Sequence, residues 1–130
     1  MPGHEFYKQA LPEVQHLGVV SFLTGGIGID EARAMRGERM KYPLAMTFVQ
    51  RYGESSQFLA HILVEISRDD GSPVLCATSE GPYLFADLPA GRYHVSATTD
   101  GGRVIERNVE VTAGGHVDLT LVWPASAGAH

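Results

Sequence analysis

Cysteine is almost absent from this chain of 130 residues. Cys76 is the only cysteine, so no disulfide can form within the chain, and the redox environment of the protein stays open. Cys76 lies in an apolar run from Val74 to Thr78, which favours a small buried core residue over a reactive thiol. We therefore expect the Cys76 thiol to resist reagents until the chain unfolds.

Basic residues are also scarce. Ten lysines and arginines stand against fifteen aspartates and glutamates, which gives a formal net charge of −5. Nucleic-acid binding needs a clustered basic face and an anionic membrane surface attracts one, so we expect neither partner. The sequence has no apolar run long enough to predict a membrane span. The chain as given also has no basic segment followed by an apolar stretch, so it predicts no secretory signal.

The patterns that accompany catalysis and cofactors are missing as well. The six histidines include no pair at helical i, i+4 spacing and no Cys/His grouping typical of a zinc site. No Gly-x-Ser-x-Gly occurs, and the glycines at 25–28 lack the Gly-Lys-Ser/Thr of a phosphate-binding loop. We therefore predict no catalytic, cofactor-binding or metal-ligating residues, and no cofactor. One question stays open, because His61 and His94 would approach each other if their strands were neighbours.

The chain is rich in glycine, proline and alternating apolar residues. Fifteen glycines and seven prolines separate stretches in which apolar side chains recur at every second position, as in half-buried strands. Seven such stretches span residues 44–49, 58–66, 74–79, 82–86, 91–99, 103–112 and 116–123. Their regular spacing predicts an all-β fold, a seven-stranded antiparallel Greek-key sandwich.

The residues ahead of these strands are organised differently. We predict an N-terminal arm over 1–42 with one short helix at about 30–41, capped by Asp30. The β-sandwich domain follows over 43–124, and a frayed tail over 125–130. The arm holds apolar residues that would form an exposed patch if left uncovered. We therefore expect residues 17–41 to pack onto the sandwich, or to mediate self-association or binding to a protein partner.

One motif is more specific than the strand pattern. Its structural residues are Gly81, Tyr83, Phe85, Leu88, Pro89, Gly91 and Tyr93. Pro89 and Gly91 suit a tight turn in which Gly91 takes a positive φ. The motif resembles the signature of the carboxypeptidase regulatory-like domain, and the resemblance covers about residues 44–123. It implies a transthyretin-like, or prealbumin-like, sandwich of the kind found as accessory modules in exported bacterial proteins, and hence a periplasmic or extracellular location.

The resemblance and the missing catalytic pattern favour a non-enzymatic accessory, structural or protein-binding module. The alternatives are a carbohydrate-binding module and a small hydrolase or metalloenzyme on the same scaffold. A carbohydrate site needs several exposed aromatic residues on one surface, whereas Trp123 has the inward parity of its strand. Among enzymes with a transthyretin-like fold, the hydroxyisourate hydrolases end in Tyr-Arg-Gly-Ser, and the corresponding end here is Leu-Val-Trp-Pro.

Overall fold

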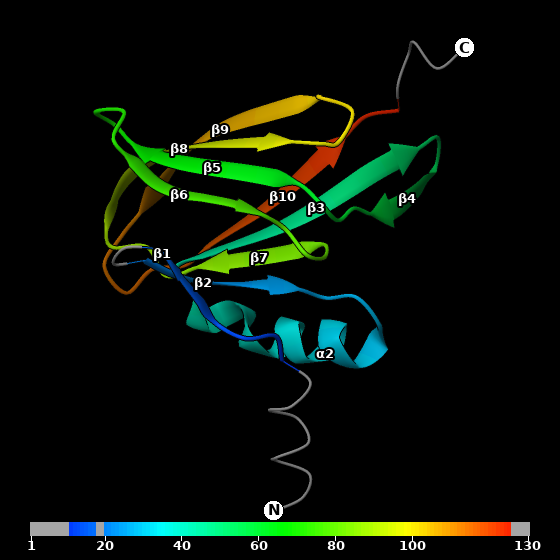
Figure 1. Ribbon diagram of the computed structural model, residues 1–130, viewed down its shortest axis with the longest axis horizontal. Coiled ribbons are helices and arrows are strands. Elements are labelled where there is room, and N and C mark those ends of the chain that lie inside the picture. The colour runs from blue at the N-terminus through cyan, green and yellow to red at the C-terminus, as the bar shows by residue number, and fades with distance from the viewer. Residues whose placement is uncertain (1–10, 18–19, 126–130) are drawn as a thin grey trace, which may run out of the picture.

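Two sheets lie face to face, and a helix covers the far side of one of them (Figure 1). This arrangement comes from a computed structural model, which describes residues 11–17 and 20–125. The tail predicted at 125–130 therefore falls outside the described residues, apart from Ala125. Within the described part of the chain, no helix is long and apolar enough to cross a membrane.

The larger sheet has the strand order β1-β2-β7-β3-β10, with β4 also paired to β3. Its strands are β1 (Gln15–Leu17), β2 (Val20–Gly25), β3 (Leu44–Tyr52), β4 (Ser55–Phe58), β7 (Tyr83–Ala86) and β10 (Val117–Trp123). β10 runs parallel to β3, with Val117 opposite Leu44. The sandwich is therefore not antiparallel throughout, because the chain returns from the smaller sheet and enters beside β3 in the same direction.

The smaller sheet has the order β6-β5-β8-β9, and all its pairs are antiparallel. Its strands are β5 (Leu63–Arg68), β6 (Pro73–Thr78), β8 (Gly91–Thr98) and β9 (Val104–Val111). Alternation along β8 buries Tyr93, Val95 and Ala97, while the residues between them are partly exposed. The smaller sheet thus has one face in the core and one face toward solvent.

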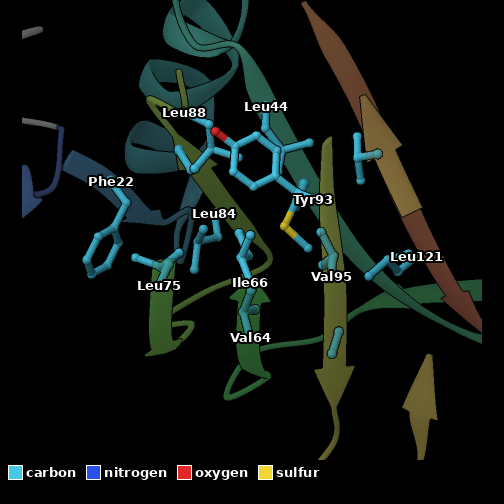
Figure 2. Close-up of a cluster of buried hydrophobic side chains, with 14 of the residues drawn as sticks. Phe22, Leu44, Val64, Ile66, Leu75, Leu84, Leu88, Tyr93, Val95 and Leu121 are labelled. Atoms are coloured by element: carbon cyan, nitrogen blue, oxygen red, sulfur yellow. The ribbon is translucent and has the colours of Figure 1, made fainter. Parts of the chain in front are cut away.

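The main core fills the space between the two sheets. Phe22, Leu44 and Leu84 of the larger sheet lie in one cluster with Ile66 and Val95 of the smaller sheet (Figure 2). This burial removes apolar surface from water, which is the dominant favourable term in folding. The arm predicted over 1–42 contributes directly, because Phe22 belongs to β2, which pairs with β7.

A second, smaller cluster lies on the other face of the larger sheet. There α2 (Ile29–Glu38) and the short 3₁₀ helix η1 (Arg39–Lys41) follow β2. Met35 of α2 is buried in one cluster with Leu23, Ala45, Tyr83 and Phe85. The strand β7 is consequently buried on both faces, which explains why all four of its residues are apolar or aromatic.

The helix differs in detail from the prediction. It begins at Ile29 and ends at Glu38, rather than spanning about 30–41, and its N-cap residue is Gly28, with no side-chain cap. Asp30 therefore does not cap it. Instead, the Glu31 carboxylate accepts the Gly26 N–H at 2.7 Å and the Ile27 N–H at 3.2 Å, which closes the glycine-rich loop before the helix.

The alternation predicted over 58–66 is interrupted in the structure. β4 ends at Phe58 and β5 begins only at Leu63, because His61 has a positive φ of 61° that an extended strand does not permit. Ile62 is buried as predicted, whereas Phe58 is 61% exposed. A single backbone angle thus divides one predicted strand into two elements.

Cys76 is exposed, so the prediction that it is a buried core residue is wrong. Its neighbour Leu75 points into the core and is 2% exposed. Since successive residues of a strand face opposite sides, Cys76 must lie on the outer face, where it sits opposite Glu65. The apolar run around Cys76 predicts the strand correctly but does not determine its register.

Candidate functional site

The candidate site lies on the outer face of the smaller sheet, on the opposite side of the molecule from α2 (Figure 1). His94 of β8 lies between Ser67 of β5 and Asn108 of β9 in the strand register. It faces outward because its neighbours Tyr93 and Val95 are buried in the core. The position of His94 therefore follows from the packing of the strand that carries it.

Both ring nitrogens of His94 have hydrogen-bond partners on β9. Nδ1 lies 3.0 Å from Asn108 Oδ1, and Nε2 lies 2.7 Å from Glu106 Oε1. The hydrogen bond with Asn108, followed by that with Glu106, raises the pKa of the His94 imidazole above its usual value of 6.5. When both oxygens act as acceptors, the ring carries two N–H donors, and this is the imidazolium form.

A hollow of about 310 Å³ adjoins this histidine. The residues around it are Asp69, Arg92, Tyr93, Asn108, Val109 and Glu110. Asn108 belongs both to the hollow and to the hydrogen-bonded pair with His94. Together the pair and the hollow form one polar surface that combines a titratable ring with room for a small molecule.

This surface does not form a nucleophilic triad. Ser67 lies directly opposite His94, but both imidazole nitrogens are bonded to residues of β9, on the other side of β8. A serine nucleophile would need one of those nitrogens as its base. Acid–base chemistry on a bound molecule likewise needs one of these nitrogens, so it requires that water or the bound molecule replace one of the two oxygens at the ring.

Metal binding has no corresponding arrangement. Across residues 11–17 and 20–125, no three His, Cys, Asp or Glu side chains are grouped to hold a metal ion. His61 precedes β5, which pairs with the far end of β8 through Leu63 and Thr98. His61 therefore lies about six strand residues from His94, so the two do not converge.

His116 has a structural role. Its Nδ1 lies 2.7 Å from the Tyr42 carbonyl oxygen, and its Nε2 lies 3.2 Å from Asp118 Oδ2. Arg39 lies 3.4 Å from the same oxygen of Asp118. These contacts connect η1 and the residue that follows it to β10, and they lie away from the outer face of the smaller sheet.

An aromatic platform for sugars is missing among the described residues. Trp123 is 1% exposed, and its indole N–H donates to the Arg103 carbonyl at 3.2 Å. The exposed aromatic residues are Tyr52 and Phe58, which flank the β3–β4 hairpin. Phe58 lies opposite Val49, three residues before Tyr52, so the two rings lie on opposite faces of the hairpin. The carbohydrate-binding alternative thus lacks the coplanar aromatics that it requires.

The motif residues identified in the sequence serve the fold at a distance from His94. Gly81 lies against the backbone of Gly25, where no Cβ would fit. The Tyr93 hydroxyl donates to the Pro89 carbonyl at 2.6 Å and so ties the end of the turn to β8. Gly91 opens β8 with a φ of 159°, which is positive but borders on the extended region. The remaining motif residues Tyr83, Phe85 and Leu88 are buried in the two clusters.

Sequence reasoning missed the residues that form this surface. Arg92 and His94 have the outward parity of their strand, but outward polar residues are ordinary in a half-buried sheet. Their grouping with Asn108 and Glu110 depends on the register between β8 and β9. The only signal in the sequence was the outer parity of His94, and it suggested His61 as a partner rather than Glu106.

The comparisons with known proteins show no family for this chain. No protein family profile matches the chain, and no curated protein is similar to it. Among solved structures, the chain is similar to a 5-hydroxyisourate hydrolase from Klebsiella pneumoniae, with 19% identity and a TM-score of 0.49. The match covers 65% of this chain and 91% of that chain. Similarity at this level assigns neither residues nor a substrate.

The matched protein is an enzyme, which corrects two of our predictions. The sequence favoured a non-enzymatic accessory module and therefore predicted no enzymatic activity. Because the matched structure is a hydrolase, neither prediction is retained. The prediction of the fold class is confirmed, since the chain is mostly β, with two sheets and one short helix. The described residues form a β-sandwich of two sheets.

Proposed function

We propose that the protein is a small hydrolase and that His94 is its general acid–base group. One observation carries the proposal: the 2.7 Å contact between His94 and Glu106 lies beside a hollow that is large enough for a small molecule. A histidine with a neighbouring carboxylate titrates in the range where proton transfer is useful at physiological pH. Asn108 lines the hollow and contacts the imidazole, so it connects the two parts of the proposed site.

The proposed reaction is the hydrolysis of a small ester or amide. Water adds its oxygen to the acyl carbon, the bond from that carbon to the leaving group breaks, and the second proton of water ends on the leaving group. His94 transfers the proton between them through Nδ1, where water takes the place of Asn108 Oδ1, while Glu106 holds the ring at Nε2 and stabilises its charged form. General acid–base catalysis of this kind contributes roughly 10²- to 10⁴-fold to a rate.

Substitution of His94 tests the proposal. His94→Gln should lower kcat/KM for a panel of small chromogenic esters and anilides, such as 4-nitrophenyl acetate, by about 10²- to 10⁴-fold. The matched control is His61→Asn, because His61 is an exposed histidine away from the hollow and asparagine tolerates its positive φ. If His94→Gln hydrolyses the panel as fast as the unaltered chain and His61→Asn, His94 is not the acid–base group.

The lineage and the location are separate proposals. We propose a relation to carboxypeptidase regulatory-like domains, supported by the motif from Gly81 to Tyr93. That relation would place the protein outside the cytoplasm of a bacterium. Fractionation of cells that make the natural protein tests the location, and recovery with cytoplasmic markers would reject it.

Association through residues 17–41 is also a proposal. The structure buries Val20, Phe22 and Leu23 of this segment within the same chain, so these residues need no partner to cover them. Ile27 and Ile29 remain 61% and 75% exposed and support the proposal. Sedimentation of the chain beside the variant Ile29→Asp tests it, and equal masses at all concentrations would contradict it. We propose that nucleic acid is not a partner, because the net charge of the chain is −5.

A further inference from the structure

The hollow beside His94 is bordered by three charged side chains. Arg92 of β8 and Glu110 of β9 lie opposite each other in the strand register, and Asp69 follows the end of β5. Among the described residues, none of the three has a hydrogen-bond or ion-pair partner for its side chain. One guanidinium and two carboxylates therefore line the same hollow, and each is available to bind a ligand.

We infer that this hollow takes a small zwitterion, a molecule with an ammonium group and a carboxylate, such as an amino acid derivative or a dipeptide. The inference rests on the proposed function and names its class of substrate. The guanidinium of Arg92 offers the paired donors that bind a carboxylate in a bidentate manner. Asp69 and Glu110 offer acceptors to an ammonium group.

Simpler ligands match these charges less well. A ligand with only negative charge would meet Asp69 and Glu110, and a ligand with only positive charge would meet Arg92, and like charges in one site are unfavourable. The volume of about 310 Å³ lies at the lower end of small-molecule sites, which suits a molecule of dipeptide size. The charges and the size therefore point to the same class of ligand.

Asn108 orients such a ligand toward His94. Its side-chain oxygen lies 3.0 Å from His94 Nδ1, so its amide N–H groups remain available as donors. A carbonyl oxygen of the ligand can accept one of them. This places the bond to be hydrolysed between the two charged ends of the ligand and next to the acid–base group.

Binding of matched probes to the full chain tests the inference without turnover as the readout. The probes are alanylalanine, its N-acetyl derivative and its C-terminal amide, titrated at low ionic strength and followed by backbone amide chemical shifts. Alanylalanine should bind at least about tenfold more tightly than either blocked probe, since each block removes one of the two charge pairs that the ligand forms with the hollow. The largest shift changes should fall at Asn108 and Glu110.

Two substitutions assign each charge to its partner. Arg92→Gln should abolish the preference for the free carboxylate while keeping that for the free amine, and Glu110→Gln should do the reverse. Arg51→Gln, on an exposed arginine of the larger sheet, should preserve both preferences. Equal affinities for the three probes, or shift changes away from this sheet, would overturn the inference.

The two proposals fail in different ways. If His94→Gln abolishes hydrolysis but the probes bind without charge preference, the substrate class is wrong and the hydrolase proposal stands. If the charge preferences are present but His94→Gln leaves hydrolysis intact, the binding site stands and the acid–base role is wrong.

Discussion

His94 has one acceptor at each ring nitrogen, and this arrangement favours the charged form of the ring. Asn108 and Glu106 both lie on β9, so the ring is held in one orientation by a single neighbouring strand. The neutral ring has one N–H and can donate to only one of the two oxygens, whereas the imidazolium can donate to both. The protonation of this ring therefore depends on Asn108 and Glu106, and no spacing pattern in the sequence identifies these two residues as its partners.

The pKa of His94 is directly measurable. An NMR titration of the imidazole should give a pKa above 6.5, and Asn108→Ala should lower it more than Glu106→Gln, because Asn108 is the larger cause of the rise. Glu65→Gln is the control, since Glu65 lies on the same outer face in the row of Ser96. A pKa at or below 6.5 in the unaltered chain would contradict the assigned bonds.

The sign of the accompanying stability effect follows from the direction of the shift. Because folding raises the pKa of His94, the bonds stabilise the folded chain fully below about pH 6.5, and this contribution is lost as the pH rises through the folded pKa. The ring is exposed to solvent, so the contribution is small. The same protonated form is the one that donates a proton in the proposed reaction.

At the scale of elements, the segment before β7 passes so close to the end of β2 that only glycine fits at position 81. Gly81 precedes β7 and lies against the backbone of Gly25 at the end of β2, so a Cβ would collide with the Gly25 carbonyl group. The adjacent pairing of β2 and β7 leaves the backbone little room to move. This close approach explains the glycine at the start of the motif better than turn conformation does.

Alanine substitutions at two glycines test this explanation. Gly81→Ala should lower the free energy of unfolding by about 1–3 kcal/mol, the usual cost of overpacking a fixed site. Gly101→Ala is the matched control, because its φ is ordinary and its Cβ would meet nothing nearer than Thr99 Oγ1 at 3.9 Å. It should be neutral or stabilise by about 0.4–1 kcal/mol. Urea denaturation measures both, and equal midpoints would show that this close approach is not rigid.

Most strands were predictable from the sequence because one face of each is buried. Period-two alternation locates β3, β5 and β8 without knowledge of their partners. The break at His61 was not predictable, since a positive φ outside glycine leaves no trace in the alternation. The exposure of Cys76 and the grouping at His94 were missed for a related reason, because both depend on register between strands that are distant in sequence.

At the scale of the whole molecule, the two sheets are tied together at the end where the chain leaves β10. Arg103 precedes β9 of the smaller sheet, and its guanidinium donates to the Pro124 carbonyl at 2.6 Å and to Gln50 Oε1 at 3.4 Å. The Gln50 amide in turn donates to the Trp123 carbonyl at 3.2 Å. One side chain thus joins β9 to both β3 and β10, at the edge of the main core.

Removal of this guanidinium should loosen the contact between the sheets. Arg103→Ala leaves the carbonyl of Pro124 and the buried side chain of Gln50 with fewer partners, and a lost bond to a charged donor costs about 1.5–3 kcal/mol. Arg107→Ala is the matched control, because among the residues that the structure describes Arg107 donates only to the adjacent Glu106 carbonyl within the same strand. It should change the free energy of unfolding by less than about 0.5 kcal/mol. Trp123 is the only tryptophan of the chain and its indole donates to the Arg103 carbonyl, so its fluorescence reports on this junction during denaturation. Equal midpoints for the two variants would mean that the sheets are held by the apolar core alone.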